Sequence, residues 1–224
     1  MITDRTLART AGLLYLATFV TSIPALALKT PFLDRGDHPQ LAIVGVILEI
    51  LLAFCCVGTA LTLYPVTRRQ GEPLALGFLA SRLLEAGIIL VGVMAVMSLV
   101  TLRVGHGTGT ATSEAETALI ALHDWAFLLG PAVMAAVNAL LLGTALYRGR
   151  LVPRLIPTLG LIGAPLLLAS SVGVMFGAWD QVSAIAGVAT IPVALWEFSL
   201  GVWLVAKGFQ PGIATAPPVG VAEA

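Results

Sequence analysis

The sequence predicts an all-α integral membrane bundle of about six transmembrane helices. Its 224 residues are 58% hydrophobic and only 11% charged, whereas soluble domains contain roughly 45–50% apolar and about 25% charged residues. Apolar runs of about 20 residues, the length that crosses the hydrocarbon core, occur six times. These runs do not alternate in polarity as the strands of a membrane β-barrel do. Helices are therefore expected, because only they satisfy every backbone polar group within one such run.

The expected spans follow the limits of the apolar runs, at residues 11–28, 41–64, 74–101, 117–147, 155–177 and 182–206. The first span has a basic start and an Ala-Leu-Ala ending, features that a cleavable signal peptide shares. We expect it to be retained, because its apolar run is long for a signal and its removal would leave five helices. Each proline within a span is expected to kink its helix, since proline lacks the backbone donor. These prolines are Pro24, Pro131, Pro165 and Pro192.

The basic residues of the short loops predict the orientation of the bundle, since cytoplasmic loops carry an excess of Lys and Arg. One side would hold eight of them, namely Arg5, Arg9, Arg68, Arg69, Arg148, Arg150, Arg154 and Lys207. The other side would hold three, namely Lys29, Arg35 and Arg103. Both termini are therefore expected in the cytoplasm. Residues 1–209 are expected to form a single transmembrane helical-bundle domain, and the Pro- and Ala-rich residues 210–224 a disordered tail.

Composition and motifs exclude several classes of partner and cofactor. The formal net charge is zero, so no nucleic-acid partner is expected. Cys55 and Cys56 are adjacent in an apolar run and predict no disulfide framework. The phosphate-binding loop and the nucleophile elbow have no match, and no cofactor is expected. The lipid bilayer is the expected partner, while homo-oligomerisation and a small-molecule ligand are left open.

Ionisable side chains within the expected spans are the most distinctive feature of the chain. Each costs roughly 2.5–3.5 kcal/mol on membrane-insertion scales and usually faces the interior of the bundle. We therefore expect them to form one buried polar network with a neutral amide companion. Its members would be Glu49, Arg82, Glu85, His123, Asp124, Asn138 and Glu197.

Counting residues from the span edges predicts how this network is layered. At 1.5 Å per residue, Arg82 lies roughly 12 Å and Glu197 about 14 Å from the cytoplasmic edge, so the two share a level. Glu85 follows one turn after Arg82, and Glu49 falls at a similar height. A guanidinium can hold two carboxylates, and we expect Glu197 and one of Glu85 or Glu49 as its partners. With one cation among three glutamates, at least one carboxyl is expected to be protonated or to titrate.

His123 and Asp124 would form an outer tier of the same column. Successive residues of a helix point about 100° apart. The two side chains are therefore expected not to contact each other and to find partners on other helices or in the outer loops.

Four stretches of the chain are similar to a known family. They are "RTAGLLYL" (9–16), "SRLLEA" (81–86), "HDWAFL" (123–128) running on to "LLLGTALYRGRLVPRLIPTLGLIG" (140–163), and "WEFSLGVWLVAKGF" (196–209). Over nearly its whole length the chain resembles an uncharacterised bacterial multi-pass membrane family catalogued as domain of unknown function 4386. The resemblance implies a compact bundle of about six helices and fits a bacterial inner-membrane location. It implies no activity, so the catalytic residues stay unknown.

Three functions remain open from the sequence. Glutamates at mid-depth with prolines beside them fit a small-solute or proton-coupled carrier, or a membrane sensor. Alternatively, the buried charges only fix helix packing. An intramembrane metal-dependent hydrolase is the third reading, with ligands drawn from His38, His106, His123, Asp34, Asp37 and Asp124. No H-E-x-x-H motif supports it, so we expect no metal and favour a non-enzymatic protein.

Overall fold

The computed structural model describes residues 3–105 and 113–210. All secondary structure in these ranges is helical, with no strand. The elements are α1 (Asp4–Arg35), α2 (Pro39–Thr67), the 3-10 turn η1 (Arg68–Gln70), α3 (Glu72–Gly105), α4 (Ser113–Phe127), the π-helical segment η2 (Leu128–Met134), α5 (Ala135–Gly149), α6 (Leu155–Met175) and α7 (Ala184–Ala206).

The described residues contain six helices that are long and apolar enough to cross a membrane, because α4, η2 and α5 run on as one span. The prediction of an all-α, multi-pass membrane protein is thus confirmed. The first four membrane-crossing helices are longer than the expected spans, whereas α6 and α7 are two residues shorter. The span Glu72–Val104, for example, has 33 residues and measures about 50 Å, against a hydrocarbon core of about 30 Å. The helix continues past the apolar run into polar residues at both ends. Hydropathy detects only the apolar run and therefore underestimates the length of the helix.

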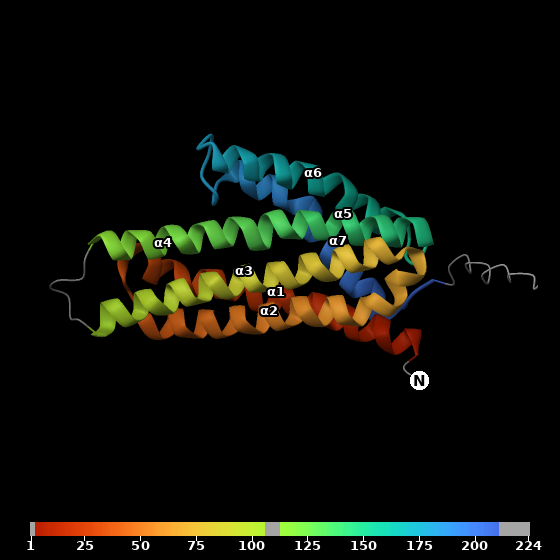
Figure 1. The fold of residues 1–224 in the computed structure, drawn as a ribbon, viewed down its shortest axis with the longest axis horizontal. Coiled ribbons are helices and arrows are strands. Elements are labelled where there is room, and N and C mark those ends of the chain that lie inside the picture. Colours follow the sequence, from red (N-terminus) through yellow and green to blue (C-terminus); the bar gives the residue numbers. More distant parts are fainter. Residues whose placement is uncertain (1–2, 106–112, 211–224) are drawn as a thin grey trace, which may run out of the picture.

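The helices lie roughly along one long axis (Figure 1). Helices α1, α2 and α3 pack in sequence order, α4 packs on α3, and α7 closes against α1 and α6. The pair α6–α7 ends well short of the far ends of α1 to α4 in Figure 1. The described residues nearest the two termini meet at the same end, which we call the terminal end. The opposite end is the distal end.

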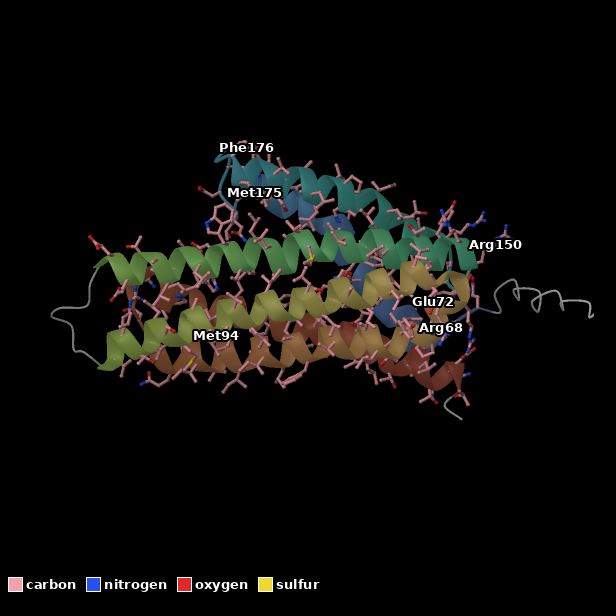
Figure 2. The ribbon with its side chains drawn as sticks, in the orientation of Figure 1. Arg68, Glu72, Met94, Arg150, Met175 and Phe176 are labelled. Carbon is pink, nitrogen blue, oxygen red and sulfur yellow. The ribbon has the colours of Figure 1, made fainter. Side chains whose placement is uncertain are left out.

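Polar contacts join the chain ends to the rest of the bundle at the terminal end. The Arg69 guanidinium donates to both carboxylate oxygens of Asp4, at 2.8 and 3.1 Å. The backbone N–H of Gln210 donates to the Leu151 carbonyl at 2.7 Å. Figure 2 shows Arg68 and Arg150 at this same end. The expected tail, beyond Gln210, lies outside the described residues.

Local sequence explains where the first and last helices begin. The Thr3 hydroxyl accepts from the Thr6 N–H at 3.2 Å, and the Ser183 hydroxyl accepts from the Ala186 N–H at 3.3 Å. Both are N-caps that satisfy a backbone donor left free at a helix start. Helix α1 stops at Gly36, which adopts φ 78°, a left-handed conformation that glycine tolerates without strain.

Helices α6 and α7 approach closely where small residues face large ones. A Cβ on Gly160 would overlap the indole of Trp196, and a Cβ on Gly163 would overlap the backbone N of Val193. Close van der Waals contacts of this kind hold helices together in a membrane. The hydrophobic effect contributes little there, because apolar side chains are already surrounded by lipid tails. The outside of the bundle is correspondingly apolar, with Phe176 86% exposed and visible at the tip of α6 (Figure 2). This surface contacts the lipid bilayer.

Pro131 coincides with a change of helix type. Residues Leu128–Met134 form π-helical turns between α4 and α5. A π-bulge accommodates the missing proline N–H without ending the helix, and such segments recur at functional sites. The other predicted prolines lie inside regular α-helices, Pro24 in α1, Pro165 in α6 and Pro192 in α7.

Candidate functional site

Arg82 of α3 organises a group of charges inside the bundle. The residue is 2% exposed. Its Nη1 donates to Glu85 Oε2 at 2.9 Å, and its Nη2 donates to Glu197 Oε1 of α7 at 3.3 Å. Glu85 lies one helical turn after Arg82, on the same face of α3. The structure thus places one guanidinium between two carboxylates.

Further side chains complete this group. Asn138 of α5 donates from Nδ2 to Glu85 Oε2 at 2.6 Å, and its Oδ1 accepts from the Ser81 hydroxyl. The Arg82 guanidinium also lies over the Tyr15 ring of α1, 5.0 Å from its centroid, where it is attracted by the negative face of the ring. We call Ser81, Arg82, Glu85, Asn138 and Glu197 the central cluster. It connects α3 with α5 and α7.

A second group of charges lies farther from the terminal end. The Lys29 side chain of α1 is fully buried, and its ammonium donates to the Glu49 carboxylate of α2 and to His123 Nε2 of α4, the latter at 3.0 Å. An ammonium offers only donors, so Nε2 must accept. The neutral ring therefore carries its proton on Nδ1, which donates to Asp124 Oδ1 at 3.2 Å. We call these four residues the distal cluster.

The distal cluster corrects four expectations from the sequence. Lys29 does not lie in a loop, because α1 continues to Arg35 and keeps Lys29 inside the bundle. Glu49 does not join Arg82 but pairs with Lys29. His123 and Asp124 do contact each other. The Asp124 side chain starts about 100° away on the helix and is 60% exposed rather than buried, but its carboxylate reaches back to Nδ1.

The two clusters lie at different depths, so the expected single column is divided. The His123 ring lies beside Gly92 of α3. Gly92 follows Arg82 by ten residues, which corresponds to about 15 Å along the helix. Ile89 lies between these two levels and is 5% exposed.

A cavity adjoins each cluster. The larger one, of about 100 Å³, is lined by Glu85, Glu197 and Arg82 together with the hydroxyl-bearing residues Thr18 and Ser22. The smaller one, of about 10 Å³, is lined by Glu49 and His123. Both are also lined by Ile89 of α3 and Pro131 of η2. These two apolar residues therefore separate the cavities.

The clusters differ in formal charge. In the distal cluster the Lys29 ammonium faces one buried carboxylate, that of Glu49, so the buried pair is neutral. In the central cluster the Arg82 guanidinium faces two, those of Glu85 and Glu197. With both carboxylates ionised, the central cluster carries one negative charge that no side chain in the described part of the chain balances. This charge lies on the wall of the larger cavity.

The residues of the hydrolase hypothesis do not converge within the described ranges. Asp34, Asp37 and His38 are exposed near the distal end, while His123 lies inside the bundle. His106 lies outside the described residues. Among residues 3–105 and 113–210, no three His, Cys, Asp or Glu side chains come close enough together to hold a metal ion.

Sequence reasoning missed Lys29, Ser81 and Tyr15 as parts of these clusters. Lys29 ends an apolar run, a position at which a lysine usually marks the membrane boundary. The stretch "ALALKTPFLDR" (25–35) also contains Pro31, which locally favours an end of the helix. No local signal in the sequence therefore indicates that the helix continues and carries the lysine inside.

Comparison with known protein families identifies a match over most of the chain. The model of a family described as "Domain of unknown function (DUF4386)" matches residues 10–208. This range includes every residue of the central and distal clusters. No curated protein and no solved structure matches the chain.

Proposed function

The chain belongs to the DUF4386 family, which carries no assigned activity, and we therefore propose a function from the chain's own site: a proton-coupled carrier of a small monovalent cation. In this proposal the central cluster binds either one proton or one cation in the larger cavity. The multi-pass membrane bundle supplies the two-sided barrier that a carrier needs.

The unbalanced charge of the central cluster carries the proposal. Glu85 and Glu197 both approach Arg82, at 2.9 and 3.3 Å. An uncompensated ion inside a bundle costs several kcal/mol, and binding one positive charge removes that cost. Because a proton and a monovalent cation would neutralise the same excess charge, each would displace the other. Such competition is the simplest way to couple a proton gradient to movement of a solute.

The lining of the larger cavity suits a small cation. The Thr18 hydroxyl donates its proton to the Tyr15 carbonyl at 2.6 Å, which leaves its oxygen lone pairs free to accept. Phe19 contributes an aromatic ring to the wall, and ring faces attract cations. The cavity has a volume of about 100 Å³, which is several times the roughly 10–15 Å³ that one water molecule requires. An alkali cation with part of its hydration shell is the matching size.

The wall of the cavity also contains an element suited to movement. Pro131 lines the cavity together with Ile89, and it belongs to η2, a segment in which the regular α-helical hydrogen bonding is interrupted. Carriers place such interrupted helices at their binding sites near the bilayer midplane. A change at η2 would alter the cavity without unfolding either flanking helix.

The proposal is tested in proteoliposomes of phosphatidylethanolamine and phosphatidylglycerol that contain the pH dye pyranine. A pH gradient is imposed, and NaCl, KCl or choline chloride is added outside. We expect at least one cation to discharge the gradient in wild-type vesicles but not in protein-free ones. Glu197→Gln should abolish the discharge, since it removes the excess charge while retaining an acceptor for Arg82. Glu72→Gln, at an exposed position of the terminal end, is the matched control and should behave as wild type.

A structural role is the second candidate, and the hydrogen bonds of Asn138 favour it. Asn138 joins Ser81 and Glu85 of α3, so the central cluster also fixes how α3 and α5 pack. In that case no cation would discharge the gradient in wild type, and Glu197→Gln would affect only stability. That result would overturn the carrier and leave the packing role.

We further propose that the terminal end faces the cytoplasm of a bacterial inner membrane. Arg69 and Arg150 belong to the basic residues of that end, whereas Lys29 no longer counts as a loop residue on the other side. The predicted excess thereby becomes eight against two. Basic loops are retained in the cytoplasm during insertion, which supports this orientation.

A further inference from the structure

The distal cluster forms a continuous series of polar contacts from the outside of the bundle to its interior. The exposed Asp124 carboxylate accepts from His123 Nδ1 at 3.2 Å. His123 Nε2 lies 3.0 Å from Lys29 Nζ, and Lys29 in turn donates to Glu49. The buried end of the series, Glu49, lines the smaller cavity together with His123. Three helices, α1, α2 and α4, contribute to it.

We propose that this series is a proton path between the distal surface and the central cavity. The inference rests on the proposed carrier function and adds the route that protons take to reach the central cluster. A purely packing role would not require the series to begin at an exposed carboxylate. The neutral Lys29–Glu49 pair would satisfy packing without His123 and Asp124.

Each transfer step balances in protons and charge. Starting from the observed arrangement, one N–H bond of the Lys29 ammonium breaks and an N–H bond forms at His123 Nε2. At the same time the Nδ1–H bond breaks and an O–H bond forms on the Asp124 carboxylate. Lys29 becomes a neutral amine, Asp124 a neutral acid, and the imidazole stays neutral in its other tautomer. The reverse sequence returns a proton from Asp124 to Lys29.

One face of α3 connects this series with the central cluster. Arg82, Glu85, Ile89 and Gly92 follow one another at spacings of three and four residues, which places them on the same side of the helix. Glu85 and Gly92 are seven residues apart, or about 10 Å along the axis. A few water molecules would span that distance.

Ile89 and Pro131 form the constriction on this route, because both line both cavities. An apolar constriction interrupts a chain of water molecules and so blocks free leakage of protons. Pro131 lies in the π-helical segment η2, so a local change of helix type would open or close the connection. The proposed carrier needs this property, since a permanently open path would dissipate the gradient.

Within the described residues, the charged groups that contact His123 directly or through Lys29 belong to the proposed path. Helix α1 presents Lys29, α2 presents Glu49 and α4 itself presents Asp124. Helix α3 presents the uncharged Gly92 beside the ring, and Phe127 stacks on the ring at a centroid distance of 6.3 Å.

Two variants test the path in the proteoliposomes described above. His123→Gln and Asp124→Asn retain polar side chains but cannot pass a proton. We expect each to slow gradient-driven discharge by roughly 10²-fold, the lower end for loss of a positioned proton-transfer group. Exchange of the radioactive cation across vesicles without a pH gradient should continue, because the central cluster is intact. The dependence of the remaining discharge on external pH should also flatten.

The results distinguish a wrong proton path from a wrong carrier function. If wild type discharges the gradient and both variants match its rate and pH dependence, the path is wrong and the carrier stands. If wild type moves neither protons nor cations, the carrier is wrong and the path with it. Asp124→Asn, at an exposed side chain, keeps the test valid if His123→Gln fails to fold, and elution from a sizing column establishes folding for each variant.

Discussion

Replacement of Lys29 tests whether α1 carries this lysine inside the bundle. Lys29→Met removes the charge and keeps an unbranched side chain of similar length. In the structure Lys29 is fully buried, and its ammonium contacts both Glu49 and His123. The variant therefore leaves the Glu49 carboxylate without its cation and His123 Nε2 without its donor.

The expected loss of stability is large. Removing one partner of a buried ion pair costs about 3–5 kcal/mol, because the remaining charge stays buried without compensation. For a protein of 150–250 residues each kcal/mol changes Tm by about 2–4 °C, so Tm should fall by roughly 6–20 °C. Lys29→Met/Glu49→Gln should recover part of this loss, since it removes the stranded charge as well. The non-additivity should reach about 1–3 kcal/mol.

Thermal unfolding in detergent, followed by tryptophan fluorescence, measures both variants. Arg35→Met is the matched control, because Arg35 also belongs to α1 and pairs with an acid, Asp37, but both side chains are largely exposed. Exposed pairs contribute little, so the Tm of this variant should equal that of the wild type. If the Tm of Lys29→Met also equals that of the wild type, Lys29 is solvated and the distal cluster does not exist as described.

Three further predictions concern the rest of the bundle. Arg82→Gln should destabilise the protein by about 3–5 kcal/mol in the same unfolding assay, and an unchanged Tm would contradict its place between two carboxylates. Gly163→Ala should cost about 1–3 kcal/mol through overpacking against α7, while Gly187→Ala, where the added methyl meets nothing within 4 Å, should cost nothing by that route. A membrane-impermeant maleimide added to intact cells should label Asp37→Cys but not Arg150→Cys, and the opposite pattern would reverse the proposed orientation.

The spans could be predicted from sequence because a membrane imposes one simple rule, a run of apolar residues of fixed minimum length. Counting along these runs also placed Arg82 and Glu197 at one level, and their side chains are 3.3 Å apart in the structure. The π-helical segment at Pro131 could not be predicted in the same way. A proline indicates that the regular pattern is disturbed, but the surrounding helices decide whether the disturbance becomes a kink or a π-bulge.

Lys29 shows why the distal cluster escaped the sequence. Hydropathy treats each residue alone and ends a span where a lysine appears. Whether a lysine can stay inside depends on partners that are far away in the chain, here Glu49 and His123, 20 and 94 residues later. Room for the side chain also matters, and Gly45 of α2 provides it beside the Lys29 stem. None of these conditions leaves a local pattern around residue 29.

The difference in charge between the clusters separates a packing role from a binding role. Packing alone would be served as well by an amide as by a carboxylate at position 197, since the oxygen of Gln also accepts from Arg82. Asn138 shows that an amide fits this network. An amide would also remove the excess negative charge, so a bundle built only for stability would gain from it. Retaining the carboxylate beside the cavity thus costs stability, and such costs are commonly found at functional sites. Glu197→Gln should consequently raise Tm while it abolishes cation-driven discharge of the pH gradient. A variant that loses both stability and discharge would instead indicate that Glu197 serves packing.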